Sequence, residues 1–160
     1  MRIISDKKIR DRNNNGLNFK PTIKINNMSE LDIRKWLSNI AETAKNKDLQ
    51  KHMELVSENV VVYGMPSGKT LSYSDWYNRR KSEFQRNLLK DLTYNNLKVK
   101  TYGLRRLIFD IEEVMDGTNG DMAVINKQVI LEQEQDEQWR VVEETIKNWK
   151  FLKGRKTNKG

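Results

Sequence analysis

Hydrophobic and polar residues alternate along the second half of the chain, which is the pattern of β-strands that bury one face. Four such runs are predicted near residues 93–102, 105–116, 121–134 and 138–149, and turns such as Gly117–Gly120 separate them. A parallel pair of strands needs a long crossover connection, and no helical pattern interrupts these runs. The four strands are therefore expected to pair antiparallel in one sheet.

Apolar residues in the first half of the chain recur at helical spacing. We expect a helix to begin at Ser29, followed by a short helix over residues 49–56, a strand over 60–63 and a third helix from Ser74 to Leu88. The first helix carries one apolar stripe, formed by Ile33, Trp36, Leu37, Ile40 and Ala44. Helices packed on an antiparallel sheet predict an α+β domain.

Three charged residues interrupt the apolar face of the predicted sheet. If the odd-numbered positions of the last three strands face inward, Glu113, Lys127 and Glu143 lie among apolar neighbours such as Phe109 and Trp139. A lone buried charge is costly, so such groups are paired or line a wet cavity. Glu113 and Glu143 are therefore candidate general acids or bases of raised pKa. Alternatively, the sheet opens to solvent at these positions, or a bulge shifts the alternation.

The net charge of +8 is concentrated at the two ends of the chain. Residues 1–27 hold seven Lys or Arg and two Asp, residues 150–160 hold five basic residues and no acidic one, and the segment between them is slightly acidic. Residues 1–27 are also polar, and we interpret them as mobile, with one short strand at Pro21–Ile25. Such ends could hold phosphates weakly, but the body is not that of a nucleic-acid-binding protein.

Several kinds of chemistry are excluded by composition and spacing. The chain has no cysteine and one histidine, His52, so disulfides, thiolate metal sites and histidine-rich metal sites are excluded. Residues 64–70 resemble a phosphate-binding loop but are one residue short, and the strands lack its crossover helices. No signal peptide or membrane span is visible. We expect a cytoplasmic protein without metal or cofactor. His52 is expected to be packed or exposed without a chemical role, and the alternative is that it carries protons in a pocket.

Several short motifs resemble those of the nuclear transport factor 2-like superfamily, and of its SnoaL-like and ketosteroid-isomerase-like branch in particular. They are Lys47-Asp48-Leu49, Ser57–Tyr63, the Pro66-x-Gly68 turn, the helix that contains Trp76, and Trp139-Arg140-Val141-Val142. The resemblance implies a cystatin-like α+β barrel, in which a cone-shaped curved antiparallel sheet packs on N-terminal helices and encloses an apolar pocket. It places this domain at residues 28–150, between basic tails at 1–27 and 151–160.

The resemblance implies a homodimer, paired through the outer face of the sheet, that binds a small, mostly apolar molecule inside the cone without demonstrated catalysis. The implied pocket is lined by Trp36, Tyr63, Trp76, Phe109, Lys127 and Trp139. The alternatives are an acid/base enzyme of isomerase, dehydratase or cyclase class that uses Glu113 or Glu143, and a module that docks acidic partners through its basic tails. Isomerases of this family carry a catalytic Asp where this chain has Tyr63 and Gly64, and an acid near Asn126–Lys127, where it has none.

Overall fold

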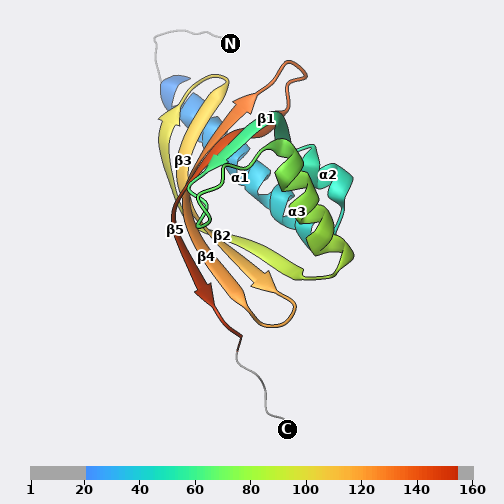
Figure 1. Ribbon diagram of the computed structural model, residues 1–160. Helices are drawn as coiled ribbons and strands as arrows, with labels where there is room; N and C mark the ends of the chain where they lie inside the picture. The colour runs from blue at the N-terminus through green and yellow to red at the C-terminus, as the bar shows by residue number, and fades with distance from the viewer. Residues whose placement is uncertain (1–20, 155–160) are drawn as a thin grey trace, which may run out of the picture. The chain divides into compact units, whose positions relative to one another are not determined.

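The computed structural model describes residues 21–154, with side chains from Glu30 onward. The compact unit that carries the sheet begins at Asp32, within the first helix. The elements, labelled as in Figure 1, are α1 (Pro21–Lys45), α2 (Leu49–Met53), β1 (Val56–Tyr63), α3 (Tyr73–Gln85), β2 (Leu89–Tyr102), β3 (Arg106–Gly117), β4 (Met122–Gln133) and β5 (Trp139–Leu152). No helix within residues 21–154 combines the length and the apolar character needed to cross a membrane.

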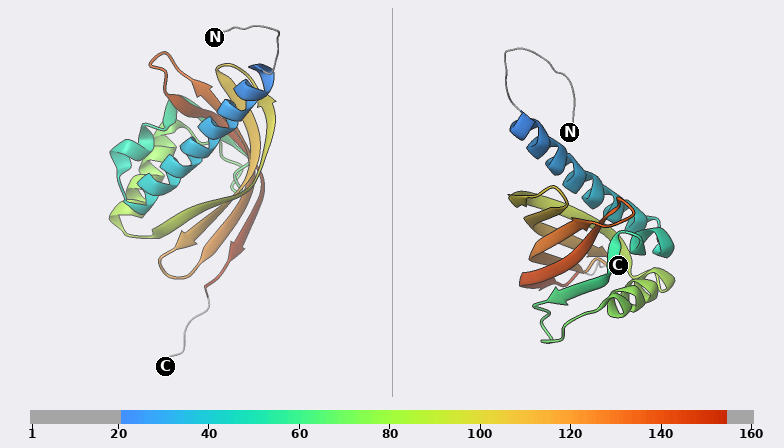
Figure 2. Two further views of the ribbon diagram at one scale, coloured as in Figure 1. Left: turned by 180° about the vertical axis from the view of Figure 1, so that it is seen from behind. Right: turned by 90° about the horizontal axis from the view of Figure 1, so that it is seen from above.

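All five strands form one curved sheet in the order β1-β5-β4-β3-β2 (Figure 1 and Figure 2). The predicted antiparallel pairing of the last four strands is confirmed. β1 pairs parallel to β5, because α3 and the three strands that follow it carry the chain across the sheet before β5 returns beside β1. The fold is thus the α+β architecture expected from the sequence, with one parallel pair at its edge.

Two helices begin at residues other than those predicted. α1 begins at Pro21 rather than Ser29, so the short strand predicted at Pro21–Ile25 is wrong. Proline favours the first turn of a helix, where its missing N–H group is not needed. α3 begins after Ser72 rather than at Ser74, because Ser72 and Asp75 form a reciprocal capping box that satisfies two backbone N–H groups.

Most of the basic ends lie outside the described residues. Within the predicted tail 1–27, only residues 21–27 are described, and they belong to α1. Within the predicted tail 151–160, residues 151 and 152 extend β5, and residues 155–160 are not described. The proposed phosphate contacts of the two ends therefore concern residues that are mostly outside the described part of the chain.

The inner face of the sheet follows the predicted alternation on β3 and β4. Leu107 and Phe109 on β3, and Val129 and Leu131 on β4, are almost completely buried. They pack against the apolar stripe of α1 and against Trp76 of α3 in one hydrophobic core. The odd-numbered positions of these two strands therefore face inward, as expected.

The alternation on β5 is shifted by two bulges. Leu131 pairs with Val141 but Ile130 pairs with Glu143, so Val142 is an extra residue. An extra residue in one strand reverses which side chains face inward beyond it. A second shift lies farther along β5. Lys127 pairs with Ile146 but Asn126 pairs with Asn148, so Lys147 is the second extra residue.

The bulges overturn part of the predicted inner face. Glu143 and Lys147 do not point into the core; Glu144 is buried and Ile146 packs against the core in their place. The second bulge restores the original alternation, so that Trp149 again pairs opposite inward-facing Ile125. The inward carboxylate on β5 is therefore Glu144 and not the predicted Glu143.

Candidate functional site

Three charged side chains from neighbouring strands meet on the inner face of the sheet. Lys127 of β4 places its Nζ 3.0 Å from both carboxylate oxygens of Glu144 on β5 and 3.2 Å from Oε1 of Glu113 on β3. Lys127, Glu113 and Glu144 are 6%, 3% and 5% exposed. Tyr94 of β2 donates its hydroxyl to Oε2 of Glu113 at 2.6 Å. One buried cation is therefore paired with two buried carboxylates. We call Lys127, Glu113, Glu144 and Tyr94 the charge cluster.

A second buried polar group lies beside the charge cluster on the helices. Arg80 of α3 donates from Nε to Nε2 of His52 at 3.2 Å and from a terminal nitrogen to Glu83 at 2.7 Å. Because an arginine only donates, Nε2 of His52 must accept, and its Nδ1 carries the proton that Thr43 Oγ1 accepts at 3.0 Å. Burial, and then the charge of Arg80, lower the pKa of His52 to about 3. The histidine is therefore packed in the interior rather than exposed, and it is neutral in the folded protein.

The two carboxylates of the charge cluster differ in their affinity for a proton. Burial alone would raise the pKa of Glu113, but the charges of Lys127 and Arg80 and the hydrogen bond from Tyr94 outweigh it, so that pKa lies below its usual value. For Glu144, burial and repulsion by Glu113 outweigh the attraction of Lys127, so its pKa is raised. A pair of acids with opposite shifts is a common arrangement at functional sites.

Substituting the two carboxylates separately is expected to give unequal effects. Because the pKa of Glu113 is lowered on folding, its ionised form stabilises the fold above the unfolded value of 4.5. Glu113→Gln should cost about 1–3 kcal/mol at pH 7, the usual range for hydrogen bonds to charged groups. The pKa of Glu144 is raised on folding, so its carboxyl group favours the folded state most when it is protonated. This contribution is lost as the pH rises from 4.5 through the pKa that Glu144 has in the folded protein. Glu144→Gln should therefore cost little stability at pH 7.

Urea unfolding of the two variants and the wild type at pH 5 and pH 7 measures this difference. The free energy of unfolding of the Glu144→Gln variant should rise relative to that of the wild type between pH 5 and pH 7. Equal losses of unfolding free energy in both variants at pH 7 would show that the two carboxylates are equivalent.

Three members of the charge cluster, Glu113, Lys127 and Glu144, form part of the wall of a cavity of about 60 Å³ that is partly open to solvent. Glu113, Lys127, Glu144 and Arg80 contribute polar atoms to this wall, and Arg79 also lines it. The remaining lining is largely apolar and includes Met65, Trp76, Met115, Ile125, Ile146 and Trp149. An apolar space with a few polar groups at one side is the usual composition of a small-molecule site.

The structure brings some of the predicted site residues together and separates others. Glu113, Lys127 and Trp76 line the cavity. Trp36 and Phe109 pack in the hydrophobic core, where the Trp36 indole donates to the carbonyl of Leu55. Tyr63 is 44% exposed, Trp139 is half-buried at the start of β5, and Glu143 lies on the other face of the sheet. None of these last three lines the cavity.

Sequence reasoning missed three polar members of the site. Glu144 was missed because the bulge at Val142 leaves no mark in the residue pattern. Arg80 was missed because helical spacing does not indicate that its guanidinium group is buried beside His52. Tyr94 was also missed, although its place on a strand next to the one that carries Glu113 could have indicated it.

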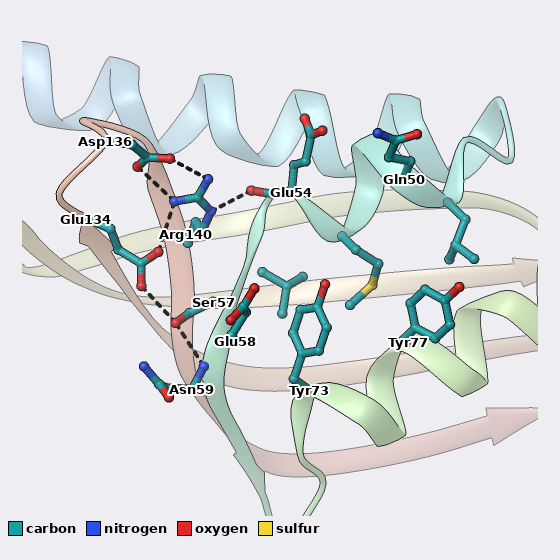
Figure 3. Close-up of a pocket in the computed structure, with 13 residues that line it drawn as sticks. Gln50, Glu54, Ser57, Glu58, Asn59, Tyr73, Tyr77, Glu134, Asp136 and Arg140 are labelled. Atoms are coloured by element: carbon teal, nitrogen blue, oxygen red, sulfur yellow. Dashed lines mark hydrogen bonds and ion pairs between the residues drawn. The ribbon is translucent and has the colours of Figure 1, made fainter.

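A larger cleft of about 860 Å³ lies at the surface between α2, β1, α3 and the loop between β4 and β5 (Figure 3). Three of its charged side chains are paired with one another: Arg140 binds Asp136 at 2.8 Å and Glu134 at 3.0 Å, and Glu134 accepts from Ser57. Arg140 also donates to the carbonyl of Glu54 at the end of α2. These bonds hold the β4–β5 hairpin against α2 and β1, so the ion pairs of this cleft have a structural role.

Comparison with known proteins identifies the fold only through structure. No family model matches the sequence, and neither does any curated protein. Three solved structures illustrate the similarity. A conserved protein from Planctomyces limnophilus has a TM-score of 0.64 and 11% identity, over 79% of this chain and 99% of its own. A protein from Novosphingobium aromaticivorans ascribed to the scytalone dehydratases has a TM-score of 0.62 and 10% identity, over 83% and 93%.

An NTF2-like protein of unknown function from Shewanella oneidensis has a TM-score of 0.61 and 14% identity, over 73% of this chain and 97% of its own. At such low identities, structural similarity establishes the architecture, while function depends on the site. The expectation drawn from the sequence motifs is confirmed at the level of architecture: this chain has the nuclear transport factor 2-like fold.

Proposed function

We propose that this protein binds a small, mostly apolar molecule in the partly open cavity beside the charge cluster. The observation that carries the proposal is the burial of Glu113, Lys127 and Glu144 at the wall of that cavity. Taking charges out of water costs several kcal/mol for each ion, and apolar residues of similar volume often stabilise a fold equally well. Retaining charges at an apolar cavity is typical of a site that orients a ligand.

The size of the cavity limits the ligand in the described conformation. A volume of about 60 Å³ accommodates only a few non-hydrogen atoms, whereas sites for larger ligands usually exceed about 300 Å³. Met65 and Met115 line the cavity, and the unbranched methionine side chain adapts readily to a new neighbour. Met65 also lies in the loop between β1 and α3, where it can move without disturbing a strand. We infer that a ligand widens the cavity by displacing these two side chains.

A second candidate function is acid/base catalysis in the same cavity. It is favoured by the raised pKa of Glu144, a carboxyl that lines the cavity and can hold a proton closer to neutral pH than an exposed one. Glu113, ionised beside it, is the candidate base. The similar structure ascribed to the scytalone dehydratases agrees with a lyase-type reaction. If the protein is an enzyme, Glu144→Gln should still bind the ligand but should no longer convert it. If the protein only binds the ligand, the wild type itself should show no conversion.

A fragment screen against a matched pair of variants tests the binding proposal. Met65→Trp should fill the cavity, and Met122→Trp, on β4 but outside the cavity lining, is the control. Ligand-observed NMR should find fragments that bind the wild type and Met122→Trp and that bind Met65→Trp at least tenfold more weakly. If no fragment binds the wild type, or if the hits bind Met65→Trp equally well, the cavity is not the binding site.

A further inference from the structure

One hydrogen-bond donor at the cavity has no partner. The indole Nε1–H of Trp76 is buried and meets no acceptor among residues 30–154, and the whole side chain is 7% exposed. A buried donor without a partner costs about 1–3 kcal/mol, so native proteins rarely leave one unsatisfied. By contrast, the indole of Trp36 donates to a backbone carbonyl at 3.1 Å. Trp76 lines the cavity, so a molecule bound there is in a position to supply the missing acceptor.

The charges around the cavity cancel. Three basic residues line it, namely Arg79, Arg80 and Lys127, and two acidic ones, Glu113 and Glu144. Glu83, which is bonded to Arg80, adds the third acid. An ionic ligand entering this site would lose hydration and meet no excess of opposite charge, which makes its transfer unfavourable.

The two cationic groups nearest the centre of the site are already engaged. Lys127 lies within 3.2 Å of both carboxylates, and Arg80 is bonded to His52 and Glu83. Neither can turn toward an anionic ligand without leaving a buried carboxylate or the histidine unpaired. Arg79 also lines the cavity, but it is exposed, and leaving water for a ligand would cost it its hydration. Among the buried donors, the neutral indole of Trp76 is therefore the one that a ligand can use at the lowest cost.

From these observations we infer that the ligand is a neutral molecule with an accepting oxygen, such as a carbonyl or an ether oxygen, that receives the hydrogen bond of Trp76 Nε1. The rest of the molecule is apolar and lies against Met65, Ile125, Ile146 and Trp149. This inference rests on the proposed function, because it names the chemical class of the molecule that the cavity takes.

Four compounds of similar ring size test the inference on the full-length protein: cyclopentanone, methylenecyclopentane, cyclopentylammonium and cyclopentanecarboxylate. The first two differ only in whether the group on the ring can accept a hydrogen bond. The chain has four tryptophans, so each indole N–H resonance can be assigned with single Trp→Phe variants. Cyclopentanone should shift the Trp76 indole proton downfield and bind more tightly than the other three compounds.

Trp76→Phe keeps an aromatic ring and removes the donor. It should weaken cyclopentanone binding about three- to tenfold, the usual effect of one neutral hydrogen bond, and leave methylenecyclopentane binding unchanged. Trp139→Phe, outside the cavity lining, is the control and should alter neither. The indole shift is measured in the wild type, and the Trp76 resonance can be assigned by elimination from the Trp→Phe variants of the other three tryptophans. It therefore decides the question even if Trp76→Phe folds poorly.

The possible failures of this experiment are distinguishable. If cyclopentanone and methylenecyclopentane shift the methyl resonances of Ile125 and Ile146 equally and the Trp76 indole does not respond, the cavity binds ligands but the acceptor inference is wrong. If either charged compound binds more tightly than cyclopentanone, the neutral-ligand inference is wrong. If none of the four perturbs Ile125 or Ile146, the proposed function fails, and the inference fails with it.

Discussion

Replacing Lys127 with methionine is expected to lower the free energy of unfolding by about 3–5 kcal/mol at pH 7, the usual cost of removing one partner from a buried ionic group. Lys127 is the cation that both Glu113 and Glu144 contact, at 3.2 Å and 3.0 Å, and all three side chains are almost completely buried. Without it, two carboxylates would face each other in the interior with only Tyr94 and Arg80 nearby. The loss should shrink as the pH falls, because protonation of the carboxylates removes their repulsion.

Urea unfolding followed by tryptophan fluorescence measures this loss, and Lys147→Met on β5 is the control. Lys147 is exposed and lies 3.8 Å from Asp110, so its removal should cost less than about 1 kcal/mol. If Lys127→Met does not fold, adding Glu113→Gln and Glu144→Gln should restore folding, because no unpaired charge would then remain. A loss below about 1 kcal/mol for Lys127→Met alone would show that the charge cluster is solvated rather than buried.

Acidification from pH 7 to pH 4.5 is expected to remove about 2–3 kcal/mol of stability through His52 alone. The pKa of His52 is lowered from 6.5 to about 3 in the folded protein, because burial and then the charge of Arg80 oppose its protonation. Between these two values the unfolded chain binds a proton that the folded protein does not. The contribution is therefore complete above pH 6.5 and is lost as the pH falls toward 3.

The single histidine of this chain makes the test direct. Its imidazole NMR resonances should not titrate between pH 8 and pH 5 in the folded protein. In His52→Gln the amide can still accept from Arg80 and donate to Thr43, so that variant should lose less stability than the wild type over the same range. A midpoint near pH 6.5 in the folded wild type would show that the imidazole is open to solvent.

The sequence predicted the sheet well where its strands are regular. The pairing of β3 with β4 has no bulge, so Phe109, Glu113 and Lys127 could be assigned to the inner face from their spacing alone. On β5 the same reasoning named Glu143, because a bulge at Val142 is a property of strand pairing and has no residue signature of its own. An error of one residue therefore changed the identity of the inward carboxylate.

The remaining members of the site depend on contacts between distant segments. Arg80 meets His52 across 28 residues, and Tyr94 meets Glu113 across 19. Periodicity can place Arg80 on the inner side of its helix, but it does not indicate which acceptor its guanidinium finds. The unpaired indole of Trp76 is equally invisible in a sequence, because it is defined by the absence of a neighbour in three dimensions.

Binding in the cavity beside the charge cluster is tested most directly by native mass spectrometry of the untagged protein, purified gently from its own cells. Met65→Trp is prepared and measured in the same way. We expect the wild type to carry a small adduct of defined mass that Met65→Trp lacks, because the larger side chain fills the space that Met65 helps to line. The mass of the adduct should correspond to a neutral compound that contains oxygen. A wild-type spectrum free of any adduct, together with no response to the fragment screen, would contradict the proposal that this cavity is a ligand site.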